Sequence, residues 1–246
     1  MKTILIKGGA RNNTAVKILT HHLLALGHII SRNPKLECDV TVSWGTSTDR
    51  KPNLNGQVNR YNKYTCFAAF DKLGVLHPTV FASHDALHRW RLSPWLARNY
   101  HHSKGKDIVV CKTYREVIEA VPHRDFFSVF IPTKTEYRVW VFQDKTLAVY
   151  EKVYKGKGEY EGFMRNQRFG FKFVKRDDLR DSPLLKSPSI NAVKALDMDF
   201  GAVDIIEGKD NKAYVLEVNS MPHIETIDRS SGIRLAASIS KWAEGQ

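Results

Sequence analysis

The sequence predicts an α+β protein that opens with a small α/β unit. Three observations support this fold class. Residues 1–80 alternate short apolar runs with segments of helical spacing. Residues 81–190 mix amphipathic helical segments with short apolar strands, and residues 195–222 hold two apolar runs joined by a polar turn, the pattern of a β-hairpin. With 42% hydrophobic residues among 246, the chain can bury a sizeable core.

The opening unit is predicted to have the order β-α-β-β. A buried strand at Thr3 to Ile6 ends at Gly8-Gly9, and Asn13-Thr14 can cap a helix that runs to about Leu26-Gly27. Two further strands are expected at 28–31 and 40–43. Gly8-Gly9 does not form the GxGxxG fingerprint, so a Rossmann-type nucleotide site is not expected in this unit.

The rest of the chain is interpreted from turn formers, caps and apolar spacing. The expected elements are a polar loop at 45–58, a helix at 59–73 stopped by Gly74, a short helix from Ser83 to Trp90, a helix at 113–120, a strand at 126–131, a hinge at 132–135, a strand at 136–142, a turn at 144–145, a strand at 147–153, a mobile loop at 155–161, a charged connection at 177–188, a helix at 190–196 capped by Ser189, the hairpin, and a last helix at 233–242.

The hairpin carries three oxygen-bearing side chains on otherwise apolar strands: Asp204, Glu217 and Asn219. Glu217 and Asn219 lie two residues apart and share a face, and hairpin pairing can bring Asp204 across from them. Two carboxylates and an amide oxygen are ligands that suit Mg²⁺, with waters and phosphates completing its shell. The alternative is an ordinary hairpin with three exposed polar residues.

The hairpin sequence, DFGAVDII, a turn, then VLEVNSMP, resembles the metal-binding hairpin of the ATP-grasp ligases, which is an Asp, about a dozen residues, then Glu-x-Asn-x-x-Pro. The resemblance extends over roughly residues 59–242. It implies an ATP-grasp fold, in which two α+β lobes clamp ATP, preceded by the small α/β domain. The implied domains are 1–80, a first lobe at 81–131 and a second lobe with the hairpin at 132–246. The family often has Gly after the Pro, whereas this chain has His223, which we treat as a candidate substrate contact.

By the same resemblance, the nucleotide site would draw on several segments. Arg98 and Lys152 would contact phosphates, the loop at 101–107 would cover the triphosphate, backbone groups near 129–131 would bind adenine, and Glu136 would hold the ribose. The full implied set is Arg98, Ser103, Lys104, Gly105, Val129, Phe130, Ile131, Glu136, Arg138 and Lys152. The loop has Asp107 where a second glycine is common. Alternation along the strand leaves open that Glu136 and Arg138 are solvent-facing charges.

The segment FMRNQRFG resembles the part of RimK-like glutamate ligases, the ribosomal-protein-modifying type, that builds the acyl-phosphate site. It implies catalytic roles for Arg165, Asn166 and Arg168; a basic surface loop is the alternative. A metal role for His101-His102 is disfavoured, because adjacent side chains point apart on an extended chain and no third ligand is evident.

The implied activity is that of an ADP-forming carboxylate–amine ligase that makes an amide through an acyl phosphate. ATP and Mg²⁺ would be required, with Mn²⁺ as a substitute. The expected partners are a small-molecule, peptide or protein carboxylate, acidic substrates included, and an amine. Two alternatives stay open: an ATP-grasp phosphotransferase, and a basic nucleic-acid-associated protein with a ligase-like core.

Charge and cysteine content agree with these expectations. The net charge is +12, and the excess of Lys and Arg lies before residue 191, which favours anionic partners: phosphates, acidic substrates or nucleic acid. The three cysteines, Cys38, Cys66 and Cys111, are scattered and without a CxxC pair, which is typical of reduced thiols in a cytoplasmic protein. No apolar run approaches ~20 residues, so no membrane span is expected.

Overall fold

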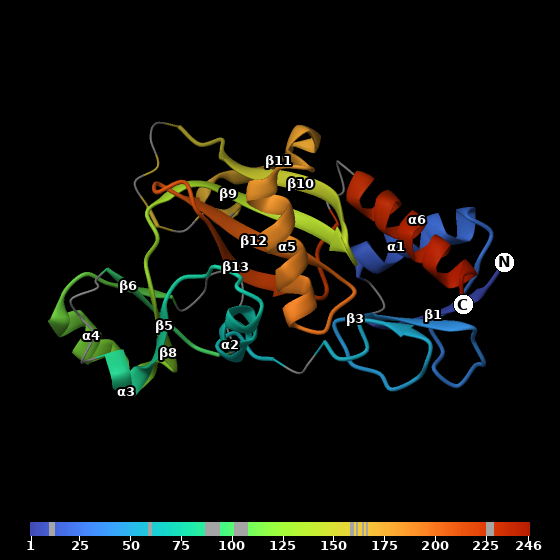
Figure 1. Ribbon diagram of the computed structural model, residues 1–246, viewed down its shortest axis with the longest axis horizontal. Helices are drawn as coiled ribbons and strands as arrows, with labels where there is room; N and C mark the ends of the chain where they lie inside the picture. Colours follow the sequence, from blue (N-terminus) through green and yellow to red (C-terminus); the bar gives the residue numbers. More distant parts are fainter. Residues whose placement is uncertain are drawn as a thin grey trace.

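The structure is a computed structural model that describes residues 1–9, 13–58, 61–86, 94–100, 108–157, 160, 162–163, 165, 167–224 and 229–246. Its strands form three sheets (Figure 1). The first contains β1 (Thr3–Gly8), β2 (Ile29–Ser31), β3 (Val40–Trp44) and β4 (Asn53–Leu54); the second contains β5 (Val80–Ala82), β6 (Trp95–Arg98), β7 (Val109–Cys111) and β8 (Phe126–Val129); the third contains β9 (Thr133–Phe142), β10 (Lys145–Tyr154), β11 (Phe171–Lys175), β12 (Phe200–Gly208) and β13 (Ala213–Asn219). The helices are α1 (Thr14–Ala25), α2 (Thr65–Lys72), α3 (Ser83–Ala86), α4 (Tyr114–Ala120), α5 (Pro183–Ala195) and α6 (Ser230–Glu244), with short 3₁₀ turns η2 (Val121–His123), η3 (Gln167–Phe169) and η4 (Asp177–Leu179).

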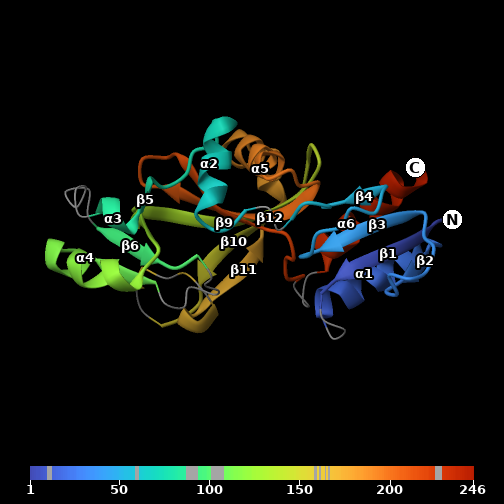
Figure 2. The same cartoon turned by 90° about the horizontal axis from the view of Figure 1, so that it is seen from below.

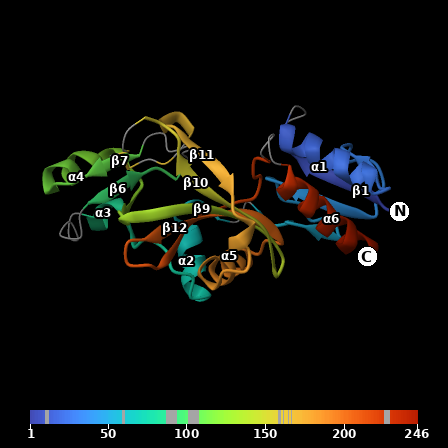
Figure 3. The ribbon, with the colours of Figure 1, turned by 90° about the horizontal axis from the view of Figure 1, so that it is seen from above.

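The N-terminal unit is a parallel sheet in the order β2-β1-β3-β4, which confirms the predicted β-α-β-β start. Asn13 caps α1 as expected, because its side-chain oxygen accepts from the Val16 N–H at 3.2 Å. β4 lies inside the segment that was expected to be loop alone. The last helix, α6, lies beside α1, so the two ends of the chain build one apolar core (Figure 3).

The central sheet is antiparallel, in the order β11-β10-β9-β12-β13. Helices α2 and α5 cover one of its faces (Figure 2). The other face is divided along the strands: Trp140, Phe142, Phe200 and Ala202 pack against the N-terminal unit, and the remaining length of the strands carries charged residues. The fold therefore leaves one half of one sheet face without an apolar covering.

The small antiparallel sheet, in the order β5-β8-β6-β7, lies at the far end from the N-terminal unit (Figure 1). Trp95 and Phe127 form its core with Val117 of α4. Thr113 and Glu116 make a capping box at the start of α4, which satisfies the free N–H groups there. The helix predicted at 113–120 is thereby confirmed.

Several predicted boundaries are wrong. Residues 133–135 are not a hinge but the first part of β9, since Thr133 and Thr135 pair with β12. The helix expected from residue 59 begins at Thr65, because the Asn62 side-chain oxygen accepts from the N–H groups of Tyr64 and Thr65, at 2.8 Å each, and holds a turn instead.

The helix predicted from Ile190 begins at Pro183 and includes Pro188. Proline is disfavoured inside a helix because it has no N–H group to donate. Here Leu185, Ile190 and Val193 pack in one core with α2 and the central sheet, and this burial outweighs the missing bond. Among the described helices, none combines the length and apolar character needed to cross a membrane.

Candidate functional site

A row of charged side chains crosses the uncovered half of the central sheet. In the strand register, Arg138 of β9 lies opposite Asp204 of β12, and Asp204 lies opposite Glu217 of β13. Because side chains two residues apart share a face, Glu136 and Asn219 belong to the same surface. The prediction that the hairpin brings Asp204 across from Glu217 is confirmed, with a β-bulge directly after Asp204.

Asp204 is held by a bidentate ion pair. The Arg138 guanidinium donates to both carboxylate oxygens, at 2.7 and 2.8 Å. Both side chains are largely buried, 18% and 7% exposed. Burial raises the pKa of Asp204, but the charges of Arg138 and Lys152 outweigh burial and hold that pKa below its usual range. Asp204 is therefore an ionised carboxylate inside the fold.

Glu217 has a different cation. The Lys63 ammonium lies 2.8 Å from Glu217 Oε2, and the Asn219 amide nitrogen donates to Glu217 Oε1 at 3.2 Å. Both members of the ion pair are about one-third exposed. Lys63 precedes α2 and was not among the residues expected from the sequence, because no local pattern connects it with a strand end far along the chain.

The donor set suits a hard divalent cation. Within the part of the chain that the structure describes, no cluster of three or more His, Cys, Asp or Glu side chains could hold a metal ion. The gathered oxygens are instead two carboxylates and one amide, which is enough for Mg²⁺ when waters and nucleotide phosphates supply the rest of its shell. Arg138 and Lys63 balance the two carboxylate charges in the structure described here.

Glu136 and Lys152 form a buried ion pair beside this row, with side chains 9% and 13% exposed. Burial raises the pKa of Glu136, although Lys152 opposes the effect. Burial lowers the pKa of Lys152, but Asp204 and Glu136 outweigh it and raise that pKa overall. The residues expected to hold ribose and phosphate thus contact each other.

A cavity of about 240 Å³ opens next to this pair. Lys152 and Arg165, two of the residues expected from the sequence, both line it together with Phe171. Arg165 is anchored there, since it donates to the backbone oxygen of Thr133 at 3.1 Å. Arg168 is exposed, lies over the Phe169 ring and is not among the lining residues.

Arg98 lies at the end of β6, and the Nε of its side chain has no hydrogen-bond partner among the described residues although that atom is buried. Burial lowers the pKa of Arg98, and the nearby Glu217 opposes the effect. An incompletely paired buried guanidinium is a candidate anion ligand.

In the segment expected to bind adenine, residues 129–131, several backbone groups already form hydrogen bonds within the protein. The N–H of Val129 donates to the Thr79 oxygen at 2.9 Å, and the N–H of Phe130 donates to the Pro94 oxygen at 3.0 Å. The Ile131 oxygen accepts from the Thr133 hydroxyl at 3.0 Å, and the Phe130 ring packs edge-on against Phe163.

Several expected site residues lie outside the described residues. They are Ser103, Lys104, Gly105 and Asn166, together with His101, His102 and Asp107. His223 is described and exposed. The structure therefore brings together residues from β9, β10, β12, β13 and the segment before α2.

Comparison with known proteins agrees with this geometry. The family model of the RimK-like ATP-grasp domain matches residues 83–243. A protein named probable alpha-L-glutamate ligase from Histophilus somni is 26% identical over 162 residues, which is 63% of this chain and 52% of that protein. A protein of the same name from Legionella pneumophila is 25% identical over 197 residues, 74% of this chain and 63% of that protein. The chain thus spans between half and two thirds of the length of these curated relatives.

Solved structures share the fold at low identity. The ATP-grasp ligase PsnB complexed with minimal precursor, Mg and ADP superposes with a TM-score of 0.73 at 11% identity, covering 99% of this chain and 96% of that one. A RiPP-associated ATP-grasp ligase from Chryseobacterium gregarium, in complex with ADP and a leader and core peptide, gives a TM-score of 0.71 at 13% identity, covering 100% and 97%. The ATP-grasp fold expected from the hairpin is confirmed, and since the family model spans more than half of its length, the chain belongs to the family of RimK-like ATP-grasp domains.

Proposed function

We propose that this protein is an ATP-dependent carboxylate–amine ligase. The observation that carries the proposal is the strand register that sets Asp204 opposite Glu217 on the same sheet face as Arg138. Lys152, on the neighbouring strand β10, and Arg165 line a cavity beside this row of charges. Hard oxygen donors beside several cations suit a nucleotide triphosphate and its metal.

The proposed ligation takes place in two steps. An oxygen of the substrate carboxylate attacks the γ-phosphorus of ATP, the bond to ADP breaks, and an acyl phosphate forms. The amine nitrogen then attacks the acyl carbon, the bond to phosphate breaks, and the nitrogen loses a proton. The products are an amide, ADP and phosphate.

The chain's own residues bind and orient the reactants. Asp204, Glu217 and Asn219 would hold Mg²⁺, with Mn²⁺ as a substitute, and the ion would draw negative charge from the phosphate oxygens. Arg138 fixes the orientation of Asp204 and keeps it ionised. Arg165, anchored to the β9 backbone, and Lys152 would neutralise charge that develops on the transferring phosphoryl group.

Further residues are proposed to contact the nucleotide and the acyl phosphate. Arg98 would bind phosphate through its incompletely paired guanidinium. Ser103, Lys104 and Gly105 would cover the triphosphate, and Asn166 and Arg168 would assist at the acyl phosphate. For the domains, we propose the divisions 1–80, 81–131 and 132–246.

The relatives' names suggest the substrates. They are named for glutamate ligation, and the two structures above contain precursor or leader and core peptides. We therefore propose an amino acid as the amine and a peptide or small acid as the carboxylate. The three free cysteines, two of them buried, fit a cytoplasmic location.

The test is ATP turnover by Glu217→Ala. Removing a ligand from a part-exposed site should abolish ADP release, while the unfolding curve stays close to wild type because little core volume is lost. Asp210→Ala is the matched control, since Asp210 lies in the turn of the same hairpin and bonds Tyr214 there.

A screen of amino acids and acidic peptides should show ADP release that needs both an acid and an amine. ADP formed without any amine requirement would favour the phosphotransferase instead. Full ATP turnover by Glu217→Ala would contradict both the proposed metal site and the proposed ligase activity.

A further inference from the structure

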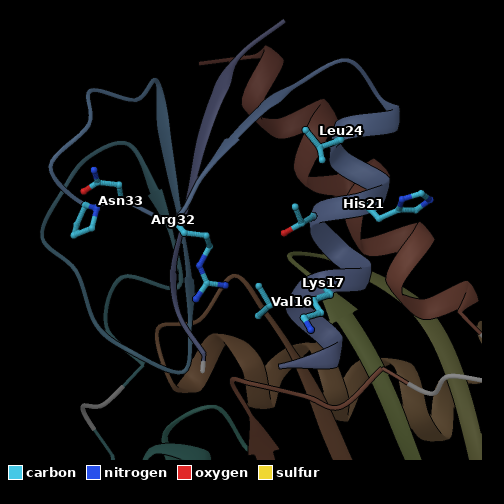
Figure 4. A pocket seen from close by; sticks show the side chains of 8 residues that line it. Val16, Lys17, His21, Leu24, Arg32 and Asn33 are labelled. Atoms are coloured by element: carbon cyan, nitrogen blue, oxygen red, sulfur yellow. The ribbon is translucent and has the colours of Figure 1, made fainter. Parts of the chain in front are cut away.

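A cavity lined by described residues lies away from the charged row, in the N-terminal unit. It has a volume of about 770 Å³, inside the ~300–1,000 Å³ range of ligand pockets. One wall is α1, and the other is the chain that follows β2 (Figure 4). The lining residues are Val16, Lys17, Thr20, His21, Leu24, Arg32, Asn33 and Pro34, and we call this cavity the α1 groove.

The α1 groove combines an apolar floor with cations and contains no acidic side chain. Val16, Leu24 and Pro34 supply the apolar surface, and Leu24 is 53% exposed. Lys17 is exposed, and its side chain makes no hydrogen bond or ion pair with the described residues. Arg32 extends from the opposite wall toward α1, whereas the His21 ring points away from it (Figure 4). The groove therefore complements a ligand that is both anionic and partly apolar.

Arg32 is held in position rather than freely mobile. Its Nη2 donates to the backbone oxygens of Gly8 and Gly9, at 2.6 and 2.9 Å. No acidic group is paired with it in the described residues. The guanidinium thus keeps its full charge and a fixed place at the mouth of the groove, which lowers the entropic cost of binding an anion.

The lining residues Arg32, Asn33 and Pro34 follow the carboxyl end of β2, and Val16 lies in the first turn of α1, which follows β1. The end of β3, at Trp44 and Gly45, lies between Gly9 beside Val16 and Met221 beyond the proposed metal-binding hairpin. A Cβ built on Gly9 would lie 3.0 Å from Val16 and 3.4 Å from Trp44, and one on Gly45 would lie 3.0 Å from Met221. Met221 is two residues beyond Asn219, so the groove and the proposed metal ligands lie on either side of the end of β3.

We propose that the α1 groove binds an acidic peptide segment, with carboxylates on Lys17 and Arg32 and an apolar side chain on Val16 and Leu24. Its assignment to the carboxylate substrate rests on the proposed ligase function. In that role the groove would select the substrate by a segment other than the reacting carboxylate. A nucleic acid fits less well, because no tryptophan, tyrosine or phenylalanine ring lines the groove for base stacking.

The test measures direct binding without ATP. The probe is a fluorescein-labelled peptide of sequence Glu-Leu-Glu-Glu-Leu-Glu, and the readout is fluorescence anisotropy. Lys17→Glu should weaken the Kd about tenfold, and Lys17→Gln by a smaller factor. Lys72→Glu is the matched control: Lys72 is the exposed last residue of α2, outside the groove, and its change alters net charge equally.

Three results would overturn the proposal. They are an unchanged Kd in Lys17→Glu, an equal loss in Lys72→Glu, and equal binding of the same peptide with Gln in place of every Glu. A single-stranded oligonucleotide that displaces the peptide and itself depends on Lys17 would assign the groove to nucleic acid instead. A far-UV spectrum and an unfolding curve confirm that each variant is folded.

This experiment is separable from the ligase test. If Glu217→Ala retains ATP turnover while peptide binding follows Lys17, the α1 groove stands and the ligase proposal fails. If Glu217→Ala loses turnover while Lys17→Glu binds the peptide normally, the ligase stands and the groove assignment fails.

Discussion

The two halves of one face of the central sheet have opposite character. Trp140 and Ala202 pair across β9 and β12, and both are buried against the N-terminal unit. Two residues along the same strands, Arg138 and Asp204 pair in the same way, and both are charged. The register between β9 and β12 is the same at both positions, so the side chains alone make one half apolar and the other charged.

The comparison shows what the charged half requires. A buried ion pair gains little net stability over apolar side chains of similar size, because both ions lose their hydration. The stability of the fold therefore does not explain why Arg138–Asp204 and Lys152–Glu136 are buried on this face, and we infer that binding does. The variants below separate the two halves.

The largest effect is expected at the apolar half. Trp140→Ala should lower the free energy of unfolding by about 3–5 kcal/mol, because a fully packed ring is replaced by a cavity. Urea unfolding followed by far-UV circular dichroism measures it. Ile233→Ala, at an exposed position of α6, serves as the control and should change stability little. A loss below about 1 kcal/mol for Trp140→Ala would mean that this half does not support the fold.

The next effect is at the charged half. Arg138→Met should lower the free energy of unfolding by about 3 kcal/mol, because Asp204 is left buried without its partner. The double variant Arg138→Met/Asp204→Leu should recover most of that stability and yet lose the thermal stabilisation by Mg-ATP. If the double variant is as unstable as the single one, the pair itself holds the sheet together and the comparison fails.

A smaller effect is expected for Lys152→Met. Nucleotide binding should weaken about tenfold, seen as a reduced Tm shift with Mg-ATP, whereas Lys145→Met at the exposed start of β10 should keep the shift. Removing Lys152 leaves Glu136 buried, and burial already raises the pKa of Glu136. A group with a raised folded pKa loses stability as pH rises, so Lys152→Met should be closer to wild type at pH 5 than at pH 8. An equal deficit at both values would contradict this account.

The smallest change in stability is expected at Arg234–Asp177, an exposed counterpart of the buried Arg138–Asp204 pair. Arg234 donates to both oxygens of Asp177, at 2.8 Å each, but Asp177 is 39% exposed, so Asp177→Asn should cost less than about 1 kcal/mol. The bonds from Arg234 lower the pKa of Asp177 to about 2. The stabilisation is therefore present above the ordinary Asp pKa and is lost as pH falls toward 2. Unfolding at pH 7 and pH 3 should show the deficit shrinking; a constant deficit would mean that the charge is not its source.

The sequence predicts best where local signals are strong. The β-α-β-β start, the helix at 113–120 and the hairpin are predicted correctly, because caps, turn residues and apolar spacing lie within a few positions of each other. Asp204 and Glu217 were placed across from each other for the same reason. Helix α5 was cut short, because its two prolines signal a break and the burial that overrides them comes from distant residues.

The site was predictable only in part. Arg138, Lys152 and Asp204 lie on strands whose alternation fixes their face, but the Arg138–Asp204 pair depends on the register of β9 and β12, which are far apart in the chain. Lys63 shows the limit: it contacts Glu217 from 154 positions away in the chain, and no pattern near either residue indicates the contact. The α1 groove was likewise not predictable from the sequence, because it forms between a helix and a loop whose packing no local pattern indicates.

The pairing of α1 with α6 has a consequence for how the chain is made. Leu19 and Leu23 share a core with Leu235 and Ile239, and buried His28 bonds Ser240 at 2.7 Å. During synthesis, α1 is made more than 200 residues before α6, so its apolar surface stays uncovered until residue 244 has emerged from the ribosome. Translation products that stop before α6 would expose that surface and be prone to aggregate.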